Sequence, residues 1–418
     1  MPPCRLNRRA NSTMPSEITN SSGQRVIFFV NGIFSENIGG GDIYFYHMAR
    51  ATIDAGYGVH YFGGHAFQNF LRKMNLPLDL TLTDDGPGNL GNVATLPGQF
   101  RLLWDFRRRL LGALSRLDEV KPDDIAYASS DYWFDTIPLM RSCARKKMLY
   151  LGMIAPSFSQ VLLKSRADVT PTRLASLYYW MSQHFSLRRF RSVPDGILTY
   201  SHPEMRDYAL KLGYRESRLR YVPNGSDLSA ADRVTEQPKK FDAVWTGRVH
   251  PQKGIDDLLA TLAWLKQQLP DFRAVVIGKS KDLLEPKIRE MGLAENITFS
   301  GLVSEEEKFR LLKSSRVFLM PSYYESWGIV VGEALAAGVP VVAYDLSCYR
   351  PVFGDFVRYA PCFDRQAFKR MAEDEIRNQR EGRNYLAKLD LRALTKSLDW
   401  KVSQANFVGA IKELASTL

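Results

Sequence analysis

The feature that most constrains the fold is a regular alternation of short apolar runs with helical segments in the second half of the chain. Each apolar run ends in a glycine or a polar loop, and each intervening segment has the apolar spacing of an amphipathic helix. Repeats of this kind form a parallel sheet with right-handed crossovers. The predicted strands are 243–246, 273–277, 297–300, 317–320 and 339–344.

The first half begins with a similar unit. A buried strand at Val26–Val30 leads to a glycine-rich stretch, Gly39–Gly41, then to a helical segment, Asp42–Ala55, and a second strand, Val59–Phe62. A strand, a glycine loop, a helix and a strand in this order open a doubly wound domain. Further strands are predicted at 125–128, 148–151, 197–200 and 219–222.

The length of 418 residues suits two α/β domains of roughly 150–200 residues each. We therefore predict two Rossmann-like, doubly wound domains that face each other across a cleft. The predicted boundaries are a disordered tail at 1–24, a first domain at 25–225, a linker at 226–240, a second domain at 241–396 and a final helix at 397–418.

The chain is basic, with a formal net charge of +11. A basic protein can bind nucleic acid, an anionic membrane or phosphorylated substrates, but no nucleic-acid-binding motif is present, so we expect no nucleic acid partner. The four cysteines lack metal-ligand or redox spacing, which favours the reducing cytoplasm. No apolar run reaches about 18 residues, so no transmembrane helix is expected.

Two cations follow the first strand of the second domain. Arg248 and Lys253 lie in the loop Thr246–Gly254, between a strand and a helix. Ligands of α/β sheets bind at this carboxyl edge, where arginine offers a fork for phosphate oxygens and lysine a point charge. The alternative is that both are solvated loop cations. Glycines at the ends of two later strands, Gly278 and Gly301, allow close approach of a ligand or simply form turns.

The segment Pro321–Pro340 carries two acidic residues. Glu325 lies in a loop after a strand, and residues 326–328 lead into a helix whose free N–H groups favour phosphate. Glu333 lies inside the otherwise apolar helix Ile329–Ala337, where a carboxylate is costly without a partner. Ribose hydroxyls would supply that partner, as in dinucleotide-binding folds. The alternative is an ion pair with a basic core residue.

These motifs together resemble those of the GT-B fold retaining glycosyltransferases of glycosyltransferase family 4, the glycosyl transferases group 1. The resemblance rests on the Gly-Arg…Lys-Gly element, the Glu-x7-Glu element with the following Ala-Ala-Gly-Val-Pro, and Asp399-Trp400, which opens the final helix. It implies that this helix crosses back to the first domain. It also implies transfer of a sugar from a nucleotide diphosphate sugar to a glycan, lipid-linked or small-molecule acceptor in cell-surface polysaccharide or glycolipid synthesis, without a metal or other cofactor.

The resemblance also implies roles for individual residues. Arg248 and Lys253 would hold the donor diphosphate, and Glu333 would bind the ribose. Glu325 would contact the hydroxyls of the donor sugar. The remaining donor contacts would come from Gly40, Gly41, Gly278, Leu302, Val303, Trp327, Gly328, Ile329 and Val330.

The first domain departs from the family pattern. Many relatives carry a histidine after a first-domain strand, whereas this chain has Met153 in that region. Asp131, after the preceding strand, is a polar candidate for a catalytic residue facing the cleft, or else part of a surface turn. His202 also follows a strand, and we expect it to pack at a helix start. A nucleotide-sugar-binding protein without catalysis therefore remains the alternative. A sugar-nucleotide epimerase or phosphorylase is disfavoured by the Glu-x7-Glu element.

A predicted helix at Gln99–Leu117 is both amphipathic and basic. Such a helix can lie on an anionic leaflet, as a lipid-linked acceptor would require. The alternative is a core-packed helix with a solvated basic face. A weaker candidate is Tyr178–Trp180 with the nearby Arg188, Arg189 and Arg191. The expected apolar stripe of the first helix comprises Leu103, Phe106, Leu110, Leu114 and Leu117, and its arginines are Arg101, Arg107, Arg108, Arg109 and Arg116.

Overall fold

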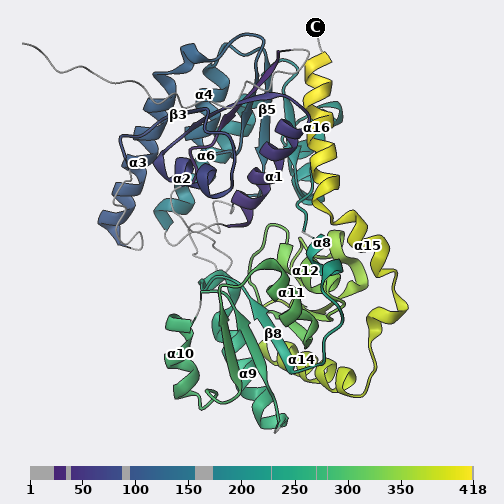
Figure 1. Cartoon of the computed structure of the whole chain (residues 1–418). Helices are drawn as coiled ribbons and strands as arrows, with labels where there is room; N and C mark the ends of the chain where they lie inside the picture. The colour runs from purple at the N-terminus through teal and green to yellow at the C-terminus, as the bar shows by residue number, and fades with distance from the viewer. Residues whose placement is uncertain are drawn as a thin grey trace, which may run out of the picture.

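A computed structural model of the chain describes residues 23–33, 39–86, 95–155, 173–226, 228–269, 271–279 and 281–416. Of the predicted disordered tail, residues 1–22 lie outside this described part. The described chain forms two α/β domains, one above the other in Figure 1, with a cleft between them whose lining is described below.

Each domain is built on one sheet in which every strand pair is parallel. The first sheet has the strand order β3-β2-β1-β4-β5-β6-β7 and the second β10-β9-β8-β11-β12-β13. The first-sheet strands are β1 (Arg25–Phe29), β2 (Gly58–Gly63), β3 (Leu80–Leu82), β4 (Ile125–Ala128), β5 (Lys146–Leu151), β6 (Ile197–Tyr200) and β7 (Leu219–Tyr221). The second-sheet strands are β8 (Phe241–Thr246), β9 (Ala274–Ile277), β10 (Ile297–Gly301), β11 (Ser315–Met320), β12 (Val341–Tyr344) and β13 (Val357–Ala360).

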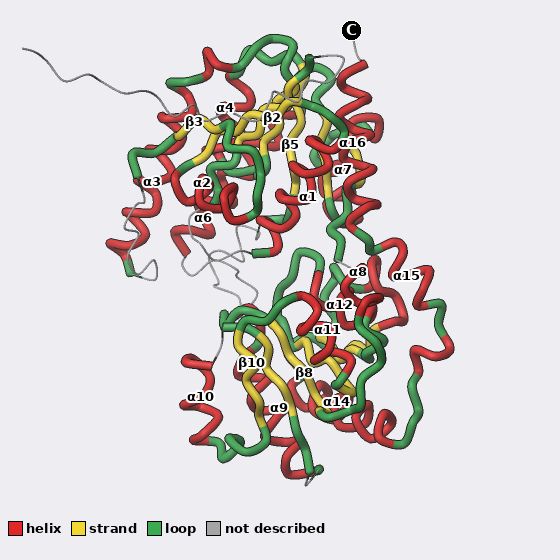
Figure 2. The backbone as a smooth tube through the Cα atoms, in the orientation of Figure 1, coloured by secondary structure: helices red, strands yellow, loops and turns green. Residues whose placement is uncertain are grey.

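Helices cover both faces of each sheet, as Figure 2 shows. The central strands are therefore buried on both faces, which explains why their sequences are continuously apolar rather than alternating. The first-domain helices are α1 (Gly40–Asp54), α2 (His65–Lys73), α3 (Leu96–Leu114), α4 (Trp133–Arg141), α6 (Arg173–Phe190) and α7 (Pro203–Lys211). The later helices are α8 (Leu228–Arg233), α9 (Ile255–Gln268), α10 (Lys281–Glu290), α11 (Glu305–Lys313), α12 (Ile329–Ala336), α13 (Arg350–Phe353), α14 (Arg365–Arg380), α15 (Leu391–Ser397) and α16 (Trp400–Ser416).

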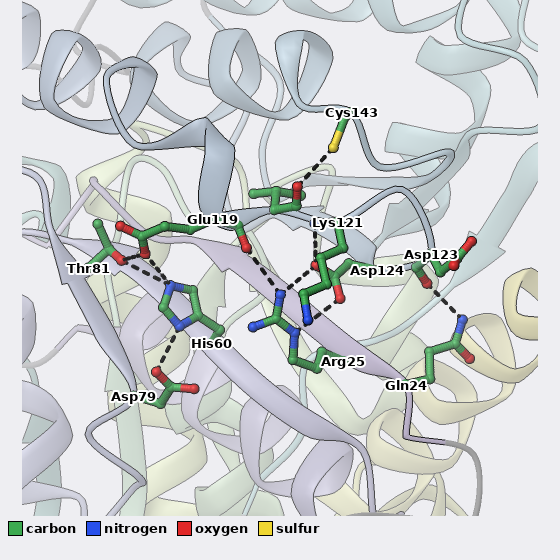
Figure 3. Close-up of polar contacts among 11 residues, drawn as sticks. Gln24, Arg25, His60, Asp79, Thr81, Glu119, Lys121, Asp123, Asp124 and Cys143 are labelled. Carbon is green, nitrogen blue, oxygen red and sulfur yellow. Dashed lines mark hydrogen bonds and ion pairs between the residues drawn. The ribbon is translucent and has the colours of Figure 1, made fainter.

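Ion pairs and hydrogen bonds join neighbouring strands of the first sheet (Figure 3). Arg25, at the start of β1, pairs with Asp124 at 2.8 Å just before β4. His60 of β2 hydrogen-bonds Asp79 at 2.8 Å and Thr81 at 3.0 Å. Each contact lies within the sheet or at the start of a strand, so this polar cluster supports the fold and does not line the cleft.

The final helix α16 crosses back and packs on the first domain beside α1 (Figure 1). The Trp400 ring stacks on His47 of α1 with their centroids 4.1 Å apart. Phe407 meets Tyr127 of β4 edge-on, and Ile411 and Leu414 are buried in the same core. The crossing predicted from Asp399-Trp400 is therefore present.

The predicted linker at 226–240 differs from expectation. It contains helix α8, whose Leu228, Ala230 and Ala231 are buried in the core of the second domain, and Val234 joins them. In the sequence, polar residues stand between these apolar residues, so the apolar face of this short helix is not apparent. Residues 228–234 therefore belong to the second domain.

The prediction that the apolar stripe of helix α3 faces a membrane is wrong. Phe106 is buried and Leu103, Leu110 and Leu114 are half-buried, so the expected membrane-facing stripe packs inward. Arg109, one of the arginines expected to make this helix basic, is buried and pairs with Asp105 at 2.9 Å and with Asp84 at 3.3 Å. A different stripe faces outward. No helix in the described ranges is long and apolar enough to span a membrane.

Candidate active site

A cavity of about 330 Å³ lies between the two domains. The first domain contributes the loop after β5 and the corner between β6 and α7, and the second domain contributes the loops after β11 and β12. Its lining residues are Met153, Ile154, Ala155, His202, Glu204, Met205, Tyr323, Tyr324, Glu325, Ser326, Leu346, Ser347 and Cys348. The cavity thus joins loops that follow strands of both sheets.

Arg248 lies exposed in the loop after β8, close to the start of α1 in the other domain. Its Nη2 atom is 3.9 Å from the position that a Cβ atom on Gly39 would occupy. The Gly39 N–H donates to the Asp42 carboxylate at 2.7 Å, and burial raises the pKa of Asp42 despite that bond and the nearby Arg248. Among the described residues, Arg248 makes no hydrogen bond or ion pair, so its guanidinium is available to an anion.

The glycines at the start of α1 lie differently from each other. A Cβ on Gly40 would be 3.4 Å from the Ile329 side chain, so the two domains come close there. Gly41 is exposed, with nothing within 4 Å of such a Cβ. Of the two predicted glycines, only Gly40 directly faces the second domain.

Lys253 and Glu325 form an ion pair of 2.6 Å, although they are far apart in the sequence. Both side chains are largely buried. The backbone beneath them explains the approach: Gly254 has φ +63°, and a Cβ there would lie 1.8 Å from the Pro321 carbonyl oxygen. The Tyr323 N–H also donates to the Gln252 carbonyl at 2.7 Å. Only glycine fits at residue 254. The contact there fixes the loop after β8 against the loop after β11.

Helix α12 begins at Ile329, shortly after Glu325 of this ion pair. Its N-cap, Gly328, has φ +95°, and a Cβ there would lie 2.7 Å from the Tyr349 ring. The Trp327 side chain is buried in the second-domain core, which leaves only its backbone for a ligand. Ile329 and Val330 occupy the first helical positions, whose N–H groups have no partner within a helix.

Glu333 has the basic partner that the sequence left as an alternative. Its carboxylate lies 2.8 Å from the Lys308 ammonium of α11. Burial alone would lower the pKa of Lys308, but Glu333 and Glu305 outweigh it and raise that pKa. The buried Glu333 carboxylate therefore lies beside a cation, Lys308.

The loops after β9 and β10 lie side by side. The Gly278 N–H donates to the Gly301 carbonyl at 2.9 Å, and both glycines have positive φ. Leu302 follows with 70% of its surface exposed, and Val303 is half-buried against the second-domain core. An exposed leucine beside two glycine turns offers an apolar platform for a flat ring.

Asp131 does not face the cleft, which corrects that part of the prediction. It is buried one layer behind the cavity and accepts a hydrogen bond of 2.5 Å from Gln183 of α6. Burial raises its pKa to about 7, against the hydrogen bonds from Gln183 and Tyr179 that lower it. Gln183 also binds the Met153 carbonyl at 2.7 Å and the Ala155 N–H at 2.8 Å. Asp131 thus supports the cavity wall from behind.

His202 caps α7, in line with the expected packing role, and it also links the domains. Its Nδ1 accepts from the Glu204 N–H at 3.2 Å, so its Nε2 carries the proton and donates to the Cys348 carbonyl at 2.9 Å. Burial lowers the pKa of His202, which favours this neutral form. Among the described residues, no group of three or more His, Cys, Asp or Glu side chains could hold a metal ion.

Solved structures with the same architecture give the class of fold. HepE from Anabaena, in complex with UDP and glucose, matches with a TM-score of 0.66 and 16% identity over 93% of this chain and 100% of that one. Sucrose-phosphate synthase from Thermosynechococcus elongatus matches with a TM-score of 0.66 and 17% identity over 94% and 99%. The fold is GT-B, as the sequence predicts.

Sequence comparison adds a family signal in the second domain. Residues 230–388 match the family model of glycosyl transferases group 1. A phosphatidyl-myo-inositol mannosyltransferase from Mycobacterium leprae is 30% identical over 206 residues, which cover 47% of this chain and 54% of that relative. The chain therefore spans about half the length of the curated relatives it matches.

The close contact at Gly254 generates a prediction. Gly254→Ala should lower the free energy of unfolding by about 2–4 kcal/mol, because the left-handed conformation costs about 1–2 kcal/mol and the contact with Pro321 adds overpacking. Gly338→Ala is the matched control, with φ +70° and nothing within 4 Å of its Cβ, and should cost only the conformational part. Urea unfolding measures both. Equal losses in the two variants would contradict the proposed interlock.

Proposed function

We propose that this protein is a retaining glycosyltransferase that moves a sugar from a nucleotide diphosphate sugar to a glycan, lipid-linked or small-molecule acceptor, in cell-surface polysaccharide or glycolipid synthesis. The observation that carries the proposal is the uncommitted guanidinium of Arg248, which lies between the start of α1 and the second-domain loops. The group 1 match over residues 230–388 and the GT-B fold support it.

The donor would lie along the carboxyl edge of the second sheet. Arg248 and Lys253 would bind the diphosphate, with N–H groups at the start of α12 and the backbone at Gly40. Glu333, which is paired with Lys308, would accept hydrogen bonds from the ribose hydroxyls. Leu302 and Val303, beside Gly278, would flank the base.

The chemistry follows from charge. As the bond to the anomeric carbon breaks, negative charge grows on the diphosphate, and fixed cations and helix N–H groups stabilise it. Lys253 also orients Glu325, whose second oxygen would accept a hydrogen bond from the donor sugar. Because these cations supply the positive charge, we propose that no resident metal is needed.

A nucleotide-sugar-binding protein without catalysis is the second candidate. It is favoured by the apolar wall at Met153, Ile154 and Ala155, where the family pattern often has a histidine. Catalysis in the first candidate does not require a protein base there, because a phosphate oxygen of the leaving group would take the acceptor proton on the same face of the sugar.

The donor site is tested by a thermal-shift panel of UDP-, GDP- and ADP-sugars. A true donor at 100 times its dissociation constant should stabilise the fold by roughly 2.7 kcal/mol, with or without EDTA. Arg248→Ala should abolish most of this shift, whereas Arg289→Ala, an exposed arginine on α10, should leave it unchanged. Glu325→Ala should abolish donor hydrolysis or transfer. Unchanged donor binding and turnover in both site variants would contradict the assignment.

The stereochemical outcome is a separate prediction. Attack and departure on the same face of the sugar keep the anomeric configuration of the donor. Proton NMR of the glycoside product should therefore show that configuration at the new linkage. An inverted product would contradict the same-face mechanism, and binding without any turnover would favour the second candidate.

We further propose that the first domain docks on the anionic, cytoplasmic leaflet of a membrane, through a face of α3 different from the predicted stripe. Phe100 and Trp104 are 65% and 63% exposed, and Leu111 continues this outward stripe with Arg107, whose guanidinium lies 5.1 Å from the Trp104 ring centroid. Arg101 lies beside them. Exposed aromatic and basic side chains in this arrangement suit a headgroup layer.

The weaker candidate, Tyr178–Trp180, is not an exposed aromatic cluster, because Tyr179 is buried and Tyr178 and Trp180 are half-buried. Other side chains of α6 do face outward. Met181 and Phe185 are exposed there with Arg188 and Arg189. Helix α6 adjoins α3, since the Tyr178 and Phe106 rings are 5.2 Å apart. These exposed α6 residues would contact the same leaflet as the outward stripe of α3.

Liposome co-sedimentation tests this docking. Vesicles with anionic lipid should bind the protein in a salt-sensitive way, and Phe100→Ser with Trp104→Ser should weaken binding about tenfold or more, because two large apolar side chains no longer leave water. Leu283→Ser is the control, since Leu283 is 62% exposed on the second domain. Binding that ignores salt or tolerates the double change would contradict the proposal.

A further inference from the structure

The first-domain wall of the cavity is mostly apolar. Met153, Ile154, Ala155 and Met205 line it, together with His202 and Glu204. If the donor lies on the second domain, this wall faces the acceptor. The polar groups on it therefore decide which acceptor chemistry can enter.

His202 is not available to an acceptor. Both of its ring nitrogens are already hydrogen-bonded, one to the Glu204 N–H and the other to the Cys348 carbonyl of the second domain. These two bonds fix the start of α7 against the loop after β12. The position of Glu204 relative to the second domain is fixed with it.

The other ionisable side chain on this wall is Glu204, and its carboxylate is available to a ligand. Among the described residues its oxygens accept no hydrogen bond, and the closest cationic candidate is His202 Nδ1 at 3.8 Å, which is itself an acceptor. Its position in the first turn of α7 stabilises the negative charge. Burial is the largest cause that raises the pKa of the Cys348 thiol, followed by the negative charges of Glu325 and Glu204. The effect of Glu204 on this thiol agrees with the position of Glu204 in the cavity.

The second-domain wall of the cavity differs from the first-domain wall in the charge that surrounds its carboxylate. Glu325 is neutralised by Lys253 at 2.6 Å, whereas Glu204 has no lysine or arginine partner in the part of the chain that the structure describes. A phosphate beside Glu204 would be repelled, although the chain as a whole is basic. A hydroxyl would instead donate to the carboxylate, a charge-assisted hydrogen bond, while Met153 and Met205 pack against C–H groups.

We propose that Glu204 is an acceptor-binding residue that selects a neutral, hydroxylated ring, such as a sugar or cyclitol, and excludes a phosphate from the cavity. This inference rests on the proposed transferase function and names the chemistry of its acceptor. In a lipid-linked acceptor, the charged phosphate would lie outside the cavity, and only the neutral ring would enter.

Saturation-transfer difference NMR tests the inference on the full chain saturated with the nucleotide diphosphate found in the donor panel. The probes are methyl α-mannopyranoside and myo-inositol, with glucose 6-phosphate as the charged counterpart. Wild type should bind at least one neutral probe more tightly than the phosphate. Glu204→Gln should weaken the binding of the neutral probes about tenfold and should reduce their preference over glucose 6-phosphate. The affinity for the nucleotide should not change.

The control is Asp207→Asn, an acid-to-amide change on the same helix outside the cavity, which should alter neither preference nor affinity. Neutral probes that bind Glu204→Gln as tightly as wild type would overturn the inference. So would a nucleotide-saturated wild type that binds none of the neutral probes. Failure of every nucleotide to bind wild type is a different result, because it overturns the proposed function itself and this inference with it.

Discussion

The site depends on the backbone contact between Gly254 and the Pro321 carbonyl. It brings the loop after β8 against the loop after β11, and Lys253 then reaches Glu325. A side chain at residue 254 would separate these loops. The ion pair, the cavity wall at Tyr323–Ser326 and the start of α12 all follow from this approach, since each belongs to one of the two loops.

A second set of contacts relates the two domains. Helix α16 packs on α1 and the first sheet, His202 reaches across to the Cys348 carbonyl, and Gly40 meets Ile329. These contacts hold the start of α1 near Arg248 and the start of α7 near the loop after β12, so donor-facing and acceptor-facing groups share one space. The division of labour proposed here, cations on the second domain and an uncommitted carboxylate on the first, follows from that arrangement.

The signals that indicate a second-domain site are local. Apart from Glu333, which lies inside α12, the predicted second-domain residues lie in loops at strand ends or at a helix start, and a parallel sheet brings its strand ends to one edge. The edge strands β3 and β13 escaped prediction because a polar residue, Thr81 or Arg358, interrupts each short apolar run. Glu333 shows the limit of a local signal: its position indicated a partner, but only the fold identified Lys308.

The first-domain details required tertiary contacts. Asp131 follows a strand, yet Gln183, distant in sequence, covers it and turns it into a support for the loop at Met153. Helix α3 carries two apolar stripes, and periodicity alone could not tell which one packs inward. Glu204 drew no attention in the sequence, because an acidic residue in the first turn of a helix is ordinary. Its place in the cavity, and the absence of a lysine or arginine partner among the described residues, emerge only from the structure.

We propose above all that a nucleotide diphosphate binds between Arg248 and the helix starts at the cleft. A crystal structure with the nucleotide diphosphate identified by the donor panel tests this binding mode most directly. We expect diphosphate oxygens within hydrogen-bonding distance of the Arg248 guanidinium and of N–H groups at the start of α12, with the ribose on Glu333. A nucleotide bound elsewhere on the molecule, with Arg248 still uncommitted, would contradict this binding mode.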